Sequence, residues 1–131
     1  MQNNVGFTCS AFDLLHAGHV AMLEEAKSVC DYLVVGLHTN PQIDRPSKNK
    51  PIQSVFERYI QLKGCKYVDE IIPYDTEEDL VNLLHIVHPD IRILGEEYQD
   101  KGYTGKGIVP AYFNKRRHNF STSNLRGKLD V

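Results

Sequence analysis

The chain has 131 residues, of which 41% are hydrophobic and 24% charged, and its formal net charge is −2. A domain of this size buries about two-thirds of its unfolded surface, and the near-neutral charge excludes a nucleic-acid binder that works by broad phosphate neutralisation. No apolar run approaches the roughly 18 residues of a membrane span, and the first residues lack the apolar core of a signal peptide. We therefore expect a single cytoplasmic domain over residues 1–131, with no membrane or nucleic-acid partner. Cys9, Cys30 and Cys65 include no CxxC pair, which predicts free thiols in a reducing compartment.

The first third of the chain alternates strand and helix patterns. Val5–Cys9 is typical of a short buried strand, and the apolar spacing from Gly18 onward predicts a helix with one buried stripe. Tyr32–Leu37 is almost continuously apolar, as in a strand that helices cover on both faces. Residues 38–50 are polar and contain prolines, so this segment should hold little regular structure.

The remaining elements follow from caps, stripes and prolines. Ser54 and Glu57 form the sequence pattern of a capping box, which predicts a helix over Val55–Cys65. The later predicted elements are a strand over Asp69–Ile72 ended by Pro73, a helix from Asp75 or Thr76 to Pro89, a strand over Ile91–Leu94, a loop with Gly102, Gly105 and Gly107, a strand over Ile108–Phe113, and a short helix capped by Ser121.

This order predicts an α/β fold with a single doubly wound domain. The connections are too long for hairpins, so we expect a five-stranded parallel sheet with right-handed crossovers and helices on both faces. In the order 3-2-1-4-5, the first and fourth strands are neighbours at the point where the strand order reverses. Ligands of such sheets bind beyond the carboxyl ends of the strands at this point. The loops after strands one, four and five should therefore meet at one crevice.

The loop after the first strand carries two histidines three residues apart, His16 and His19. They open a predicted helix, whose first N–H groups and partial positive charge favour an anion. Gly18 would let phosphate oxygens approach the backbone, and each imidazole can donate a hydrogen bond. The stretch therefore predicts a site for a nucleotide phosphate. Read alone, the two histidines are also compatible with a cap, with core packing or with metal ligation.

Three segments in order resemble the HxGH nucleotidyltransferases, and in particular the cytidylyltransferases: residues 12–19, 93–98 and 116–123. In length and motif order the chain is most similar to the glycerol-3-phosphate cytidylyltransferase type. The resemblance implies a Rossmann-like nucleotidyltransferase fold, a homodimer, and Mg²⁺ held mainly by the nucleotide phosphates. It also implies transfer of CMP from CTP to a small phosphorylated alcohol, with glycerol 3-phosphate as the best acceptor, giving a CDP-alcohol and pyrophosphate.

The same resemblance assigns roles to particular residues. The catalytic group that it implies, which stabilises the charge of the phosphates, consists of His16, His19, Arg116, Lys48 and Lys50. Nucleotide contacts are implied for Ala11, Phe12, Gly18, Gly95, Glu97, Ser121 and Thr122, together with His16, His19 and Arg116. Contacts with the acceptor are implied for Asp13, Arg58 and Lys66. No metal ligands are expected from the protein.

The chain departs from the family pattern at three places. Ala11 replaces a threonine, Lys66 replaces an arginine, and residues 117–119 replace Thr-Glu-Gly. Because of the last change, either Arg116 or Arg117 is the arginine that binds phosphate in that motif. The choice between Lys48 and Lys50 is equally open.

Two other functions stay open beside cytidylyl transfer. The stretch Phe12–Val20 equally resembles adenylyltransferases that activate sugar phosphates, which makes ATP the alternative nucleotide. The departures above are also compatible with a nucleotide-binding module that does not turn over.

Overall fold

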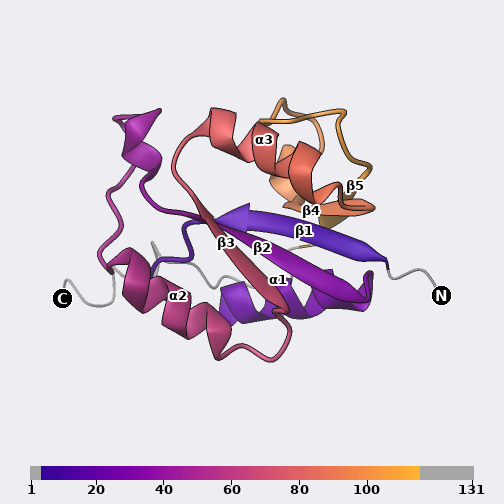
Figure 1. Ribbon diagram of the computed structural model, residues 1–131, viewed down its shortest axis with the longest axis horizontal. Coiled ribbons are helices and arrows are strands. Elements are labelled where there is room, and N and C mark those ends of the chain that lie inside the picture. The colour runs from indigo at the N-terminus through magenta and orange to yellow at the C-terminus, as the bar shows by residue number, and fades with distance from the viewer. Residues whose placement is uncertain (1–3, 116–131) are drawn as a thin grey trace.

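The computed structural model describes residues 4–115, which form a five-stranded parallel sheet in the order β3-β2-β1-β4-β5 (Figure 1). The predicted fold class and strand order are confirmed. The strands are β1 (Val5–Ser10), β2 (Tyr32–His38), β3 (Glu70–Tyr74), β4 (Ile91–Gly95) and β5 (Ala111–Asn114). The helices are α1 (Ala17–Ser28), α2 (Val55–Lys63) and α3 (Glu77–Val87), with short 3₁₀ turns η1 (Pro41–Ile43) and η2 (Glu96–Tyr98).

Helices cover both faces of the sheet, and each face has its own core. On one face Leu23 of α1 and Leu62 of α2 pack against the odd-numbered apolar residues of β2. On the other face, which α3 covers in Figure 1, Leu80 and Leu84 pack with Val34 of β2. Successive strand residues point to opposite faces, so the apolar run of β2 fills both cores at once. Among the described helices, none is long and apolar enough to cross a bilayer.

The caps that set the helix starts follow the sequence closely. The Ser54 hydroxyl accepts the Glu57 N–H at 3.1 Å, and the Glu57 carboxylate accepts the Ser54 N–H at 3.0 Å, which confirms the predicted capping box. Thr76 caps α3 in the same way, with Asp79 as its reciprocal partner. Helix α2 ends at Lys63, two residues earlier than predicted, because Gly64 supplies the C-cap.

Two strand boundaries differ from the prediction. Pro73 does not end the third strand but lies within β3, opposite Leu37 of β2. Because β3 is an edge strand, a residue without an N–H is tolerated there. The last strand begins at Ala111, not Ile108, because Ile108 and Val109 first pack into the core beside α3.

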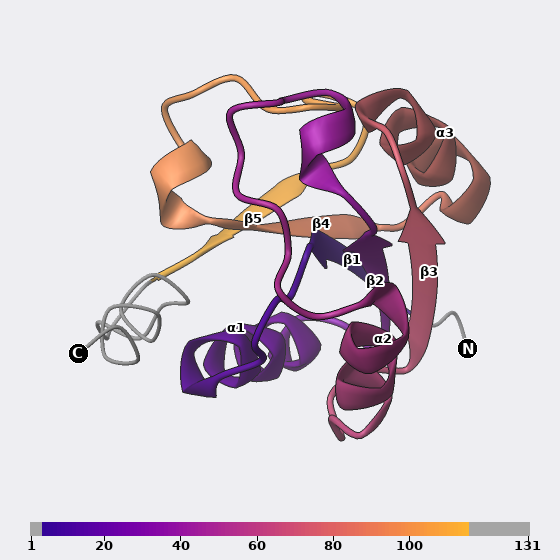
Figure 2. The same cartoon turned by 90° about the vertical axis from the view of Figure 1, so that its left-hand side faces the viewer.

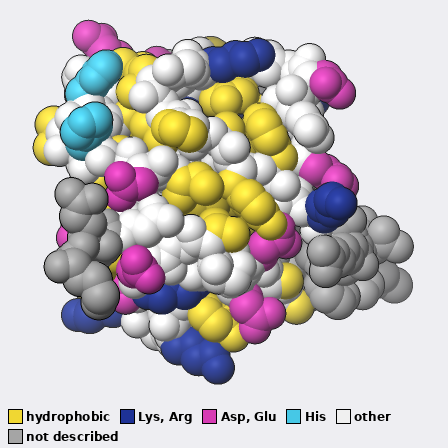
Figure 3. Space-filling view, turned by 90° about the vertical axis from the view of Figure 1, so that its right-hand side faces the viewer, with side chains coloured by type: hydrophobic (Ala, Val, Ile, Leu, Met, Phe, Trp, Pro, Cys, Tyr) yellow, Lys and Arg dark blue, Asp and Glu magenta, His cyan; other side chains and the backbone are white. Residues whose placement is uncertain are grey.

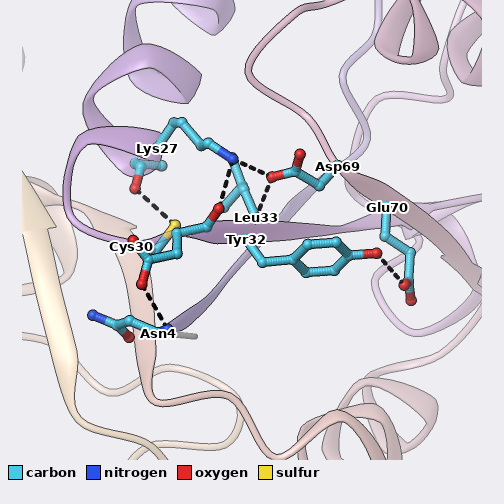
Figure 4. Close-up of polar contacts among 9 residues, drawn as sticks. Asn4, Lys27, Cys30, Tyr32, Leu33, Asp69 and Glu70 are labelled. Atoms are coloured by element: carbon cyan, nitrogen blue, oxygen red, sulfur yellow. Dashed lines mark hydrogen bonds and ion pairs between the residues drawn. The ribbon is translucent and has the colours of Figure 1, made fainter. Parts of the chain in front are cut away.

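The amino edge of the sheet, by which we mean the end of the sheet at which its strands begin, is held together by polar contacts (Figure 4). The Lys27 ammonium bonds the Asp31 carbonyl at 2.9 Å and the Asp69 carboxylate, which also accepts the Leu33 N–H at 2.8 Å. The Tyr32 hydroxyl donates to Glu70 at 2.8 Å. Seen from this side, lysine and arginine side chains are interspersed with acidic and hydrophobic ones and form no broad basic patch (Figure 3). This edge ties α1 to strands β2 and β3.

The carboxyl ends of β1 and β2 face the viewer in Figure 2. The segment between β2 and α2, residues 40–52, crosses in front of the strand ends in this view, and we call it the arch. The turn η2 follows β4 at the other side of the same edge. The loops after strands one, two and four therefore all lie at this edge.

Candidate functional site

A cavity of about 780 Å³ lies between α1 and the β4–β5 half of the sheet. Its position at the carboxyl ends of β1 and β4 is the crevice that the strand order predicts, and its volume is in the range of small-molecule sites. Its wall includes Ser10, His16, Gly18, His19, Gly95, Glu97, Tyr98, Asn114 and Lys115.

The two histidines form a capping box at the start of α1. His16 is the N-cap, and its Nδ1 accepts the Gly18 N–H at 3.0 Å, while Nδ1 of His19 accepts the His16 N–H at 3.2 Å. The rings stack with their centroids 3.9 Å apart. Because each Nδ1 accepts a hydrogen bond, the proton of each neutral ring lies on Nε2. The cap uses Nδ1 of each ring and leaves Nε2 for the predicted phosphate contact, so these two interpretations of the sequence do not exclude each other.

His19 is held in its neutral form. Burial lowers the pKa of His19 to about 4, the nearby His16 adds to this effect, and Asp13 opposes it. The ring also packs edge-on against Phe12, with centroids 5.5 Å apart. At neutral pH His19 is therefore a neutral hydrogen-bond donor beside the positive end of a helix, which suits a phosphate oxygen.

The opposite wall carries an acidic group above a glycine. The Glu97 carboxylate lies directly over the α-carbon of Gly95, where a Cβ would overlap with it. Glu97 and Tyr98 belong to η2, and both line the cavity. The wall thus offers carboxylate oxygens that accept hydrogen bonds, and a ring on which a flat group can stack.

The structure brings together five of the predicted site residues: His16, Gly18, His19, Gly95 and Glu97 all line the cavity. Their roles toward a nucleotide stay predictions.

Other predicted residues lie elsewhere. The Phe12 side chain is 1% exposed and lies in the core beneath His19, and the Ala11 carbonyl accepts a hydrogen bond from Arg58. Lys48 and Lys50 are exposed on the arch and are not part of the cavity wall. The predicted Arg116, Ser121 and Thr122, and with them the alternative Arg117, fall outside the residues that the structure describes.

The three residues expected to bind the acceptor also lie outside the cavity wall. Asp13 and Arg58 are buried, with 8% and 2% of their surfaces exposed, and bond to the chain itself. Lys66 is exposed and lies over the Tyr67 ring, beside a second cavity of about 540 Å³. The described contacts of Asp13 and Arg58 are therefore internal, and their contact with the acceptor stays a prediction.

Most residues of the wall were not predicted, and three of them are polar residues at the carboxyl ends of strands. Ser10 ends β1, and Asn114 and Lys115 lie at the end of β5 and just after it. The rule that ligands bind at carboxyl strand ends could have found all three, because they directly follow the predicted strands Val5–Cys9 and Ile108–Phe113. Lys115 brings a positive charge to the wall at the point where the described chain ends.

Comparison with known proteins shows similarity along nearly the whole chain. The model of the family described as Cytidylyltransferase-like matches residues 7–128. The Bifunctional protein HldE of Caulobacter sp. (strain K31) is 36% identical over 97% of this chain, and that of Campylobacter jejuni subsp. jejuni serotype O:6 is 34% identical over 94%. The chain spans 27% of the length of each of these relatives.

Solved structures share the fold. The lipopolysaccharide core biosynthesis protein from Thermoplasma volcanium GSS1 has a TM-score of 0.70 and 24% identity, and the match covers 91% of this chain and all of that one. Pantothenate synthetase from Thermus thermophilus has a TM-score of 0.66 and 16% identity, with 93% of this chain and 61% of that one covered.

Proposed function

Because the chain belongs to the cytidylyltransferase-like family of nucleotidyltransferases, we propose that it transfers AMP from ATP to a sugar phosphate, giving an ADP-sugar and pyrophosphate. One observation carries this proposal: two stacked imidazoles with Nε2 protons stand at a helix N-terminus, in a cavity where the strand order reverses. The Nε2–H groups and the N-terminus of the helix can bind the phosphate oxygens of a nucleotide.

The reaction needs no nucleophile from the protein. A phosphate oxygen of the acceptor attacks the α-phosphorus of the nucleotide in line, a P–O bond forms, and the bond to pyrophosphate breaks. Charge builds on the α-phosphoryl oxygens and on the leaving pyrophosphate. The Nε2–H groups of His16 and His19 donate hydrogen bonds to these oxygens, and the N-terminus of α1 adds its dipole. Lys115 would serve the outer phosphates from the opposite wall.

Adenylyl transfer is favoured over cytidylyl transfer by two features. The HldE proteins align with more than nine-tenths of the chain, and this includes the stretch Phe12–Val20 that resembles adenylyltransferases of sugar phosphates. The likeness to glycerol-3-phosphate cytidylyltransferases, by contrast, is broken at Ala11 and Lys66. The lysine at position 66 lacks the planar guanidinium with which an arginine donates two parallel hydrogen bonds to a phosphate.

Mg²⁺ and a second subunit are part of the proposal. Among the described residues no cluster of three His, Cys, Asp or Glu side chains has the arrangement of a metal site. We propose that phosphate oxygens are the main ligands of the ion, which is the usual way in which Mg²⁺ binds with nucleotides. The cation would neutralise the charge of the triphosphate and its leaving group. A homodimer is proposed from the family resemblance, and light scattering at several concentrations tests it.

The test is pyrophosphate release from pairs of nucleotide and acceptor. ATP and CTP are each combined with hexose and heptose 1-phosphates and with glycerol 3-phosphate, in the presence of Mg²⁺. We expect release with ATP and a sugar phosphate. Release only with CTP and glycerol 3-phosphate would replace adenylyl by cytidylyl transfer. ATP binding without release from any pair would support a nucleotide-binding module instead.

A further inference from the structure

A buried arginine lies at the base of the arch. Arg58, on α2, is 2% exposed, and its guanidinium donates four hydrogen bonds, all to main-chain carbonyls. Nε bonds the Gln53 carbonyl at 3.1 Å, and one terminal nitrogen bonds the carbonyls of Ala11 at 3.0 Å and His38 at 2.8 Å. The other terminal nitrogen bonds the Thr39 carbonyl at 2.7 Å. Four of its five N–H donors are therefore used within the protein.

These carbonyls belong to three separate segments. His38 and Thr39 lie where β2 passes into the arch, and Gln53 lies where the arch returns to α2. Ala11 belongs to the turn between β1 and α1, five residues before the N-cap His16. A single planar group thus binds both ends of the arch and joins them to the loop that leads to the histidines.

A second set of bonds joins the same turn to the end of the arch. The Asp13 carboxylate accepts the N–H groups of Ile52 at 2.9 Å and Gln53 at 3.0 Å. The Gln53 side chain in return accepts the Leu14 N–H at 2.8 Å. The coupling between the turn and the arch therefore does not depend on one bond.

The turn needs this support because its backbone is strained. Phe12 and Leu14 both have a φ of 51°, in the left-handed region that costs bulky residues about 1–2 kcal/mol each. Such conformations persist only where the surroundings hold them.

From these contacts we infer that Arg58 is a positioning residue: it sets the arch, and with it the acceptor, at a fixed distance from the histidines that hold the triphosphate. The inference depends on the proposed function, because it assigns the acceptor to the carboxyl ends of the strands, where the arch and the cavity both lie. Arg58 itself touches no substrate in this account. The arch carries the exposed Lys48 and Lys50, which are the cations that it can bring to an acceptor phosphate.

Only an arginine can make this set of contacts. Lysine keeps the charge, but its three donors radiate from one nitrogen and cannot reach carbonyls on three sides of a plane. Exchange of Arg58 for lysine should therefore leave a folded protein in which the arch and the turn are no longer held at one distance.

The experiment compares Arg58→Lys with Arg45→Lys. Arg45 lies on the arch itself, its side chain is 50% exposed, and it pairs with Glu77 at 3.4 Å. Arg45→Lys is therefore the same substitution on the arch at a residue that does not hold the arch to the turn. Hydrogen exchange is measured at the amides of Leu14, Ile52 and Gln53, with Leu33 at the opposite edge as an internal reference. The dissociation constant of ATP, kcat and the KM of the acceptor are measured on the same samples.

In Arg58→Lys we expect exchange at the three amides to rise by about tenfold or more and kcat to fall by about tenfold to a hundredfold, since small misplacements have effects of this size. The dissociation constant of ATP should change by less than about threefold, because the capping box and the η2 wall remain. Arg45→Lys should leave all these quantities within about twofold. If Arg58→Lys does not fold, Arg58→Ala is measured with guanidinium chloride added at a low concentration, which should restore kcat.

Two results would overturn the inference. One is a rise in the acceptor KM with kcat and amide exchange unchanged, which would make Arg58 a direct acceptor contact. The other is amide exchange equal to that of Arg45→Lys. If no nucleotide and acceptor pair releases pyrophosphate even with the wild-type protein, the proposed function fails, while the exchange measurement still decides whether Arg58 holds the arch to the turn.

Discussion

At the scale of single residues, the histidines divide their work between two nitrogens. Nδ1 of each ring serves the fold by closing the capping box, and Nε2 carries the proton that the proposed chemistry needs. This division makes it possible to remove one role and keep the other. An asparagine at an N-cap supplies an acceptor where Nδ1 stood but has no donor at the position of Nε2.

His16→Asn should therefore keep the stability and lose the activity. We expect its free energy of unfolding to change by less than about 0.5 kcal/mol, whereas His16→Ala should lose about 1 kcal/mol with the cap. Both variants should lose about a hundredfold or more in kcat, the usual effect of one missing donor to a developing oxyanion. Urea unfolding and pyrophosphate release measure the two effects. Wild-type activity in His16→Asn would show that Nε2 has no chemical role.

The pKa of His19 links stability to pH. Since the pKa is about 4 in the folded chain and 6.5 ordinarily, the unfolded chain binds more protons between these two values. This contribution to stability is complete above pH 6.5 and is lost as the pH falls toward 4. One pKa unit corresponds to about 1.4 kcal/mol, so the loss approaches about 3 kcal/mol. As the pH falls over this range, the free energy of unfolding of the wild type should decrease more than that of His19→Asn. Equal pH slopes of the two proteins would contradict the low pKa of His19.

Gly95 leaves room for a carboxylate. In Gly95→Ala the new methyl group would displace the Glu97 carboxylate, which is the mobile end of its side chain. We expect little change in the unfolding free energy, within about 0.5 kcal/mol, but a weaker nucleotide affinity. Glu97→Gln keeps the size of the side chain and is the matched comparison for its charge. Calorimetric titration with ATP measures both, and an unchanged affinity in both would remove Glu97 from the site.

At the scale of elements, short sequence patterns predicted the helix caps and helix faces, because these depend on residues only a few positions apart. The Ser54–Glu57 box and the stripe of α3 were found because a cap or a helical face lies within a few residues of sequence. The histidine capping box was open among several interpretations, because the usual cap rules concern Ser, Thr, Asp and Asn. The prediction that Pro73 ends a strand is wrong, because a local rule on proline does not include the position of β3 at the side of the sheet.

We expect the amino edge of the sheet to serve stability alone and the carboxyl edge to carry the activity, and Asp69 tests this. Burial acts to raise the pKa of Asp69, but the hydrogen bonds from Lys27 and Leu33 outweigh it, so the pKa lies below its ordinary value. Asp69→Asn would lose the ion pair at the amino edge (Figure 4), at the opposite ends of the strands from Gly95 and from the loop that leads to His16. We expect a loss of about 1 kcal/mol in stability with kcat and KM unchanged. A changed kcat at a temperature where the variant is folded would mean that the two edges are coupled.

At the scale of the whole molecule, the alternation of strands and helices predicted a parallel, doubly wound sheet, and the strand order 3-2-1-4-5 expected for it is confirmed. That order placed the loops after β1 and β4 side by side, and five predicted site residues line the resulting cavity. The burial of Arg58 was not predictable, because a charged residue on a short amphipathic helix is usually exposed. Its four carbonyl partners come from distant segments, and their positions exist only in the folded chain.

The most direct test of the account is a crystal structure of the protein with a non-hydrolysable ATP analogue and Mg²⁺. We expect phosphate oxygens at about 2.7–3.2 Å from Nε2 of both His16 and His19, in the cavity between α1 and η2. A triphosphate bound elsewhere on the molecule, with both imidazoles out of its reach, would contradict the account.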